Sequence, residues 1–211
     1  FTMRNASPNI CPEPTTTLIQ ALTESCNTAF AKYGAEVLKA EKLKAMARNF
    51  GFEETPTIDR DDKNSCFQVA VSTAGKMQTE DGKEIPSEVA QSAIGQSNVQ
   101  MTPLQGAMIS AAVANNGSQM RPYLVQQLKA SDLTTVHYTA DPAELRRSIS
   151  QQQAGDLQNM MISVVENGSG KNARINGFRV GGKTGTADNA TEAESHGWFI
   201  SFAMKDNQPV I

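Results

Sequence analysis

Apolar residues recur at helical spacing in several parts of the chain, so the sequence predicts a substantial helical content. Thr15 to Thr17 are suitable N-caps for a first apolar stripe, which runs from Leu18 to Tyr33. A second helix is expected over residues 35–50, where Gly51 is a typical stop. These two segments predict a helical region near the beginning of the chain.

The later helices carry clearer end signals. A helix is expected from Thr102, with a proline in its first turn and Gln105 as the partner in a capping box. Another is expected to begin at Ser150 and to close at Asn167-Gly168. By the same capping logic, Asp141 to Glu144 is expected to open a short helix.

Extended segments are expected within residues 119–139 and over two final strands, 178–187 and 197–204. Residues 1–14 have the prolines of a loop, and residues 53–85 have the charges of a long irregular excursion that holds at most a short strand. Long helices in the middle and neighbouring strands at the end predict an α+β fold. We expect an antiparallel sheet flanked by helices, with a helical subdomain.

Size and charge narrow the function classes. The 211 residues and 22.7 kDa suit one domain, and a net charge of −3 leaves no basic patch for nucleic acid. The chain begins at Phe1 and ends in an apolar run, Pro209 to Ile211, that resembles the start of a further strand. We therefore expect residues 1–211 to be the C-terminal part of a single domain, truncated at both ends.

The cysteines leave two alternatives open. Cys11, Cys26 and Cys66 form no Cys-x-x-Cys pair, and only two histidines accompany them, so neither a metal site nor a cofactor is expected. A disulfide between Cys11 and Cys66 is one alternative, and buried free thiols are the other. For Cys26 we prefer the buried free thiol.

The richest chemistry lies on the first of the two final strands, at Lys183-Thr184-Gly185-Thr186. Alternation places Lys183 and Gly185 on one face and the two threonines on the other. At a sheet edge the lysine supplies a cation, the threonines offer hydroxyls to a carboxylate, and Gly185 lets a substrate backbone approach. The Thr186 N–H is expected to contribute to an oxyanion hole, where one donor is worth on the order of 3 kcal/mol.

A second candidate element is Ser25-Cys26-Asn27, inside the first apolar stripe. Serine and asparagine compete with helical backbone bonds, so this element is more natural at a helix junction than in the middle of a helix. A short hydroxyl held rigidly at Ser25 can relay a proton, and Asn27 can bind a substrate amide. The alternative is that Ser25 is an ordinary solvent-facing residue.

Taken together, several motifs resemble the transpeptidase domain of class B penicillin-binding proteins. They are Ser25-Cys26-Asn27, Ile94-Gly95-Gln96, Thr102-Pro103-Leu104-Gln105, Gly182 to Ala187 and His196-x-Trp198-Phe199. The Cys-Pro-x-Pro-Thr stretch at residues 11–15 is similar to the actinobacterial penicillin-binding protein A group. The resemblance covers nearly all of residues 10–205.

The resemblance implies a serine D,D-transpeptidase of peptidoglycan, acylated by β-lactams, without a cofactor. In it Ser25 would relay a proton, Asn27 would contact a substrate amide, and Lys183 would supply positive potential. Thr184 and Thr186 would bind the substrate carboxylate beside Gly185. No serine in the 211 residues has a lysine three positions later, so we expect the nucleophile to lie outside this chain and the chain alone to be inactive.

The same resemblance implies the partners and the location. The expected partners are a stem peptide ending in D-Ala-D-Ala, β-lactams and other cell-wall synthesis proteins. A membrane anchor is expected in a segment before Phe1, which would place the protein on the extracytoplasmic face of the membrane. A penicillin-binding sensor domain and a serine β-lactamase remain alternatives, although no Glu-x-x-x-Asn deacylation loop is apparent before Lys183.

Overall fold

The computed structural model describes residues 2–56, 58, 69–188 and 194–210. The helical elements, in chain order, are α1 (Leu18–Thr23), α2 (Asn27–Tyr33), the π-helical turn η1 (Gly34–Leu38), α3 (Lys39–Asn49), α4 (Pro86–Ser92), α5 (Pro103–Ala114), α6 (Gln151–Asn167) and the 3₁₀ turn η2 (Lys171–Ala173). The strands are β1 (Thr73–Ala74), β2 (Val99–Gln100), β3 (Ser118–Met120), β4 (Gln127–Lys129), β5 (Val136–Thr139), β6 (Glu144–Arg147), β7 (Arg179–Ala187), β8 (His196–Lys205) and β9 (Gln208–Pro209).

Every strand pairing in the described part of the chain is antiparallel, as expected for the α+β class. The main sheet has the order β7-β8-β9, and its long β7–β8 ladder runs from Arg179 opposite Met204 to Ala187 opposite His196. β1–β2, β3–β6 and β4–β5 form separate two-stranded pairs.

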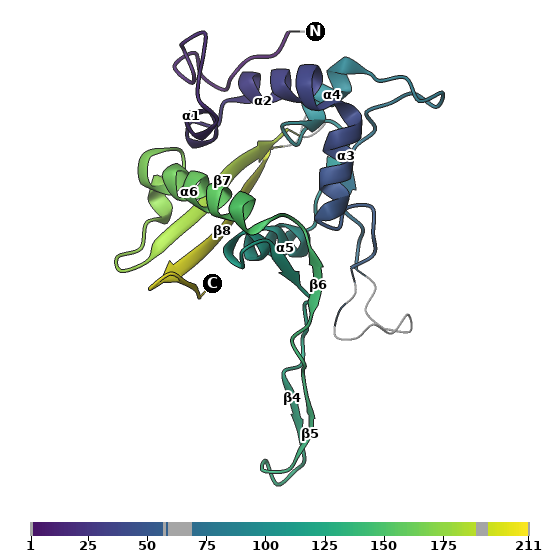
Figure 1. Cartoon of the computed structure of the whole chain (residues 1–211), viewed down its shortest axis with the longest axis vertical. Coiled ribbons are helices and arrows are strands. Elements are labelled where there is room, and N and C mark those ends of the chain that lie inside the picture. Colours follow the sequence, from purple (N-terminus) through teal and green to yellow (C-terminus); the bar gives the residue numbers. More distant parts are fainter. Residues whose placement is uncertain (1, 57, 59–68, 189–193, 211) are drawn as a thin grey trace.

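Figure 1 shows how these elements are arranged. Helices α1 to α4 gather at one end of the molecule, and α6 lies across the main sheet. The end of β7 that leads to Ala187 points towards this helical group. A hairpin formed by β4 and β5 projects away from the opposite side. The last residues of β7 are therefore brought to the helices that contain the first apolar stripe.

The core lies where α5 and α6 pack on the sheet. Phe202 on β8 is 1% exposed and packs with Val113, Ala154 and Ile162. Burying an aromatic side chain of this kind stabilises the fold by on the order of 3 kcal/mol. A Cβ at Gly181 would lie 2.3 Å from the Phe202 ring, so glycine is required before the Lys183 motif for the sheet to pack.

The helix predictions with strong end signals are confirmed. Thr102 caps α5 by accepting a hydrogen bond from the Gln105 N–H, and Ser150 and Gln153 form a complete capping box at α6. The second predicted helix is observed as α3, which follows α2 and η1 after a break at Lys39, where φ is +64°. Within the described residues, no helix is both long and apolar enough to cross a bilayer.

Two local predictions are wrong because tertiary contacts outcompete them. Gln105 does not complete a capping box; its buried side chain donates to the Phe50 carbonyl instead (2.6 Å). The segment at Asp141 to Glu144 forms no helix, since Glu144 begins β6 and pairs with Met120 on β3.

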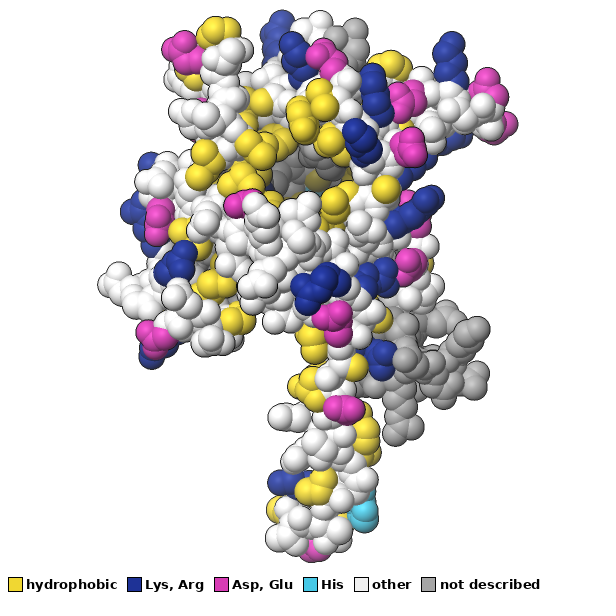
Figure 2. Space-filling model, viewed as in Figure 1, with side chains coloured by type: hydrophobic (Ala, Val, Ile, Leu, Met, Phe, Trp, Pro, Cys, Tyr) yellow, Lys and Arg dark blue, Asp and Glu magenta, His cyan; other side chains and the backbone are white. Residues whose placement is uncertain are grey.

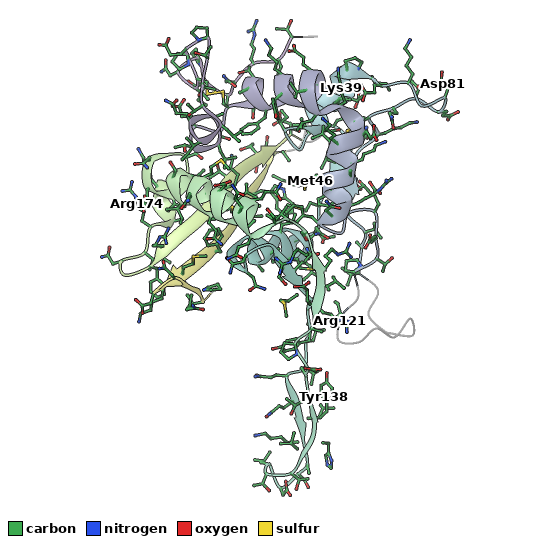
Figure 3. The ribbon with its side chains drawn as sticks, viewed as in Figure 1. Lys39, Met46, Asp81, Arg121, Tyr138 and Arg174 are labelled. Carbon is green, nitrogen blue, oxygen red and sulfur yellow. A yellow bond between two sulfur atoms is a disulfide. The ribbon has the colours of Figure 1, made fainter. Side chains whose placement is uncertain are left out.

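The cysteine expectations also need correction. Cys26 is buried as expected, but it forms a disulfide with Cys11, so both the free thiol and a Cys11–Cys66 bridge are wrong (Figure 3). The first residues fold back over the start of α2, where Asn5 Oδ1 accepts from the Thr28 N–H (2.9 Å). This reversal brings the two cysteine Cα atoms to 6.1 Å and leaves no signal in the hydrophobic pattern. Cys66 lies outside the described residues.

The disulfide should stabilise the fold because it closes a loop of 15 residues in the unfolded chain. We expect Cys11→Ser to lower the free energy of unfolding by about 3 kcal/mol in a urea titration. Cys66→Ser is the matched control, since it removes a thiol outside the bridge and should leave the midpoint unchanged under oxidising conditions. Identical midpoints for Cys11→Ser and the unmodified chain would contradict the assigned pairing.

Candidate active site

Ser25 lies at a helix junction, not in the middle of one long helix. Helix α1 ends with the Ser25 N–H donating to Leu22 O (3.2 Å) and the Cys26 N–H donating to Ala21 O (2.8 Å). These two bonds form a Schellman motif, and Cys26 then occupies the N-cap position of α2 without a side-chain capping bond. The prediction that this motif marks a helix junction is therefore confirmed, and the apolar stripe from Leu18 to Tyr33 is divided between α1 and α2.

The backbone at Ser25 is strained. Its φ is +61°, in the left-handed region that Schellman motifs usually fill with glycine. A side chain in this conformation costs about 1 kcal/mol or more. The strain is retained at the residue whose hydroxyl faces β7, which favours a functional role for this side chain.

Lys183 joins this junction to the main sheet. Its ammonium donates a hydrogen bond to Ser25 Oγ (2.7 Å), although the two residues are 158 positions apart. The lysine also donates to its neighbour's carbonyl, Thr184 O (2.7 Å). Burial lowers the pKa of the Lys183 ammonium below its ordinary value. The structure thus brings together the two elements that the sequence singled out.

The rest of the motif lies along the edge of β7 that is not paired with β8. The carbonyl of Thr186 accepts a hydrogen bond from the Gln96 side-chain amide (3.1 Å), which comes from the turn after α4. Since the N–H and C=O of one strand residue point to the same side, the Thr186 N–H also points away from β8. Gly185 is exposed beside it, and a Cβ built there would be in ordinary contact with the Trp198 Cβ alone, at 3.4 Å.

Asn27 occupies the first turn of α2, two residues after Ser25. Its side chain is half-buried and has no hydrogen-bond partner among the described residues. An amide of this kind has donors and an acceptor available for a ligand. Asn27 therefore lies two residues along the chain from Ser25, which bonds Lys183 on β7.

One polar neighbour of this site was missed by sequence reasoning. Ser169, in the turn after α6, has its hydroxyl 2.7 Å from the hydroxyl of Thr184. In the sequence this residue attracts attention only as part of Ser169-Gly170-Lys171, whose lysine comes one place too early for a nucleophile motif. The contact becomes visible only in the structure, where α6 packs on β7 and the turn after α6 lies beside Thr184.

A cavity elsewhere in the described residues is a separate feature. It measures about 1140 Å³, lies between α5, β3 and β8, and is lined mostly by apolar side chains. None of the motif residues on β7 or at the α1–α2 junction lines it. Figure 2 shows another hollow bordered by apolar side chains, in the upper half of the view.

The described residues contain no cluster of three potential metal ligands.

Comparison with known proteins identifies relatives for nearly the whole chain. Residues 3–211 match the family model described as the penicillin binding protein transpeptidase domain. The peptidoglycan D,D-transpeptidase PbpA of Mycolicibacterium smegmatis is 38% identical over 202 residues, which cover 94% of this chain. The same alignment covers 38% of the relative, so this chain spans well under half of its length.

Solved structures give the same result. The crystal structure of PBPA from Mycobacterium tuberculosis has a TM-score of 0.78 at 36% identity, covering 94% of this chain and 46% of that one. The imipenem acyl-enzyme complex of penicillin-binding protein A from M. tuberculosis has a TM-score of 0.76 at 37% identity, covering 90% and 39%. The similarity therefore includes a protein that a β-lactam acylates.

The strain at Ser25 predicts a measurable gain in stability when it is removed. Ser25→Gly and Ser25→Ala both delete the hydroxyl that bonds Lys183, but only glycine relieves the left-handed backbone. We expect the glycine variant to be about 1 kcal/mol more stable than the alanine variant in urea unfolding. Equal stabilities would show that the junction does not hold Ser25 in this conformation in solution.

Proposed function

Because this chain belongs to the penicillin-binding-protein transpeptidase family, we propose that it supplies the proton-relay and substrate-binding half of a serine D,D-transpeptidase active site. The reaction begins when a serine attacks the D-Ala-D-Ala carbonyl of a stem peptide and releases the terminal D-Ala. The acyl group then passes to an amine of a neighbouring peptide. The observation that carries the proposal is the hydrogen bond between Lys183 Nζ and Ser25 Oγ.

This hydrogen bond fits a proton relay. Because Lys183 donates to Ser25, the oxygen of Ser25 accepts, and its own O–H proton is left to point at another group. A hydroxyl held in this way can pass a proton between the nucleophile and the leaving amine. Burial lowers the pKa of the Lys183 ammonium, and its positive charge favours negative charge developing nearby.

The edge of β7 fits an extended peptide. Gly185 leaves the backbone open, and the outward Thr186 N–H is placed to donate to an oxyanion. The hydroxyls of Thr184 and Thr186 suit the terminal carboxylate of the donor peptide. Asn27, two residues after Ser25 at the start of α2, has an amide suited to hold the peptide amide.

The nucleophile is proposed to come from outside the 211 residues. No serine in the chain precedes a lysine by three positions, and the relatives are more than twice as long as the part that aligns. On this proposal, residues 1–211 are the C-terminal part of a single transpeptidase domain. A Ser-x-x-Lys segment elsewhere in the protein completes the site.

The setting follows from the reaction. The substrates are peptidoglycan stem peptides, and β-lactams act as their analogues. We place the protein at the extracytoplasmic face of the membrane, with an anchor in a segment before Phe1 and with other cell-wall synthesis proteins as neighbours. A net charge of −3 is consistent with partners other than nucleic acid.

Acylation tests this assignment. We expect the full-length protein to bind a fluorescent penicillin covalently at one site, as shown by gel fluorescence and intact mass. The 211 residues expressed alone should remain unlabelled, because they lack the attacking serine. Covalent labelling of the 211-residue chain would contradict the location of the nucleophile, and an unlabelled full-length protein would contradict the function.

A further inference from the structure

The open edge of β7 is covered in part by side chains of the chain itself. Residues two apart on a strand direct their backbone groups to the same side, so the carbonyls of Thr184 and Thr186 both face away from β8. Thr184 O accepts a hydrogen bond from the Lys183 ammonium (2.7 Å), and Thr186 O accepts one from the Gln96 side-chain amide (3.1 Å). Both carbonyls of an edge that would otherwise attract another extended chain are therefore already bonded.

The backbone that carries Gln96 is held in a tight turn after α4. The Gln96 N–H donates to Gln91 O (3.0 Å), and the residue before it, Gly95, has a left-handed backbone with φ +75°. Ser97, the residue after it, is also left-handed (φ +63°), which is strained for a residue with a side chain. The Ser97 hydroxyl bonds the Glu88 carboxylate on α4. Gln96 is therefore presented from a fixed position between two unusual backbone conformations.

Close packing sets the position of this turn. A Cβ at Gly34, the first residue of η1, would lie 2.3 Å from the Cβ of Ala93 at the end of α4, so a side chain there would push α4 away. Figure 1 shows α4 in the helical group towards which this end of β7 points. The Gln96 side chain is half-buried and flexible. Because its backbone is held, only this side chain has to move for Thr186 O to become available.

An extended peptide on this edge needs the same carbonyl. In a hydrogen-bonded antiparallel pair, the two opposite residues exchange both of their backbone bonds. A peptide residue whose carbonyl accepts from the Thr186 N–H therefore directs its own N–H to Thr186 O. Benzylpenicillin has the same pattern, since its side-chain N–H is attached next to the β-lactam carbonyl. The ligand amide and the Gln96 amide both approach Thr186 O from the open side of β7, so they compete for it.

We propose that Gln96 is a displaceable cap on the β7 edge, which occupies Thr186 O until an amide N–H of the ligand replaces it. The inference rests on the proposed function and concerns which ligands that site selects. Exchanging one neutral hydrogen bond for another gains little, so Gln96 reduces the advantage that a ligand obtains from its amide. A ligand without this amide can leave Gln96 in place and is not affected by the cap.

Other roles for Gln96 lead to different expectations. If its side chain only holds β7 in position, its removal slows acylation by every ligand. If it binds the ligand directly, its removal slows acylation by ligands with a polar side chain. A displaceable cap differs from both, because its removal speeds acylation, and does so only for ligands that bring their own N–H to Thr186 O.

The test compares benzylpenicillin with penicillanic acid, which keeps the bicyclic nucleus and the carboxylate but lacks the acylamino side chain. The measured quantity is the second-order rate constant for acylation of the full-length protein, followed by intact mass. The slower ligand is measured by its competition with a fluorescent penicillin. Both ligands carry the β-lactam carbonyl, so only the amide at Thr186 O distinguishes them on this proposal.

We expect Gln96→Met, which keeps the length of the side chain and removes its amide, to raise the rate constant for benzylpenicillin by about fivefold, the effect of one net hydrogen bond. The rate constant for penicillanic acid should change by less than about twofold, since no bond is exchanged. Gln100→Met is the matched control, because Gln100 is exposed on β2, which pairs with β1. This control should change neither rate constant.

Every other result contradicts the cap. Slower acylation by both ligands in Gln96→Met would assign a structural role, and slower acylation by benzylpenicillin alone would assign direct ligand binding. Unchanged rates would show that Gln96 does not compete for Thr186 O, and equal gains for both ligands, or the same gain in Gln100→Met, would show that the amide has no part in the effect. If the unmodified protein reacts with neither ligand, the proposed function fails first, and the role of Gln96 fails with it.

Discussion

The structure depends on one contact between distant parts of the chain, the hydrogen bond from Lys183 Nζ to Ser25 Oγ. It joins a helix junction near the start of the sequence to the edge of the main sheet near its end. Neither element is a site alone, since a strand lysine and a helix-end serine are ordinary residues. Their chemistry arises because α6 packs on β7 and also contacts α1, which sets the distance between the two elements.

Two residues at this contact are in locally unfavourable states. Ser25 adopts a left-handed backbone that glycine would adopt more easily, and Lys183 loses hydration, which is the cause of its lowered pKa. Neither feature stabilises the fold by itself. Strain and desolvation of this kind persist where the surrounding structure imposes them, and they are common at functional sites. Here the surroundings include the Cys11–Cys26 disulfide, which fixes the residue directly after Ser25.

Sequence reasoning succeeded where local signals agree with the tertiary structure. Caps and periodicity at Thr102 and Ser150 predicted α5 and α6, and the two expected final strands, 178–187 and 197–204, are observed as β7 and β8. It failed where a distant partner decides. Glu144 pairs with β3 instead of opening a helix, and Gln105 bonds Phe50 instead of capping its own helix.

The residues of the candidate site also fall into those that local sequence motifs could suggest and those that only the tertiary structure reveals. Ser25, Asn27 and Lys183 were proposed because their residue types occur in recognisable motifs, and the structure joins two of them by the Lys183–Ser25 hydrogen bond. Ser169 and the Cys11–Cys26 bridge were not found, because each depends on a chain reversal that leaves no periodic pattern. Glycines on both sides of Ser169 were the available signal, since paired glycines often mark a close approach of backbones.

The most direct test of the account is a double-mutant cycle on Ser25 and Lys183 in the full-length protein. The rate constant for acylation by benzylpenicillin is measured for Ser25→Ala, Lys183→Ala and the double variant. If the two side chains act as one relay, the double variant is no slower than the slower single variant, and the coupling free energy exceeds about 2 kcal/mol. If the two losses simply multiply, the residues act independently, and the contact on which this account depends has no part in the reaction.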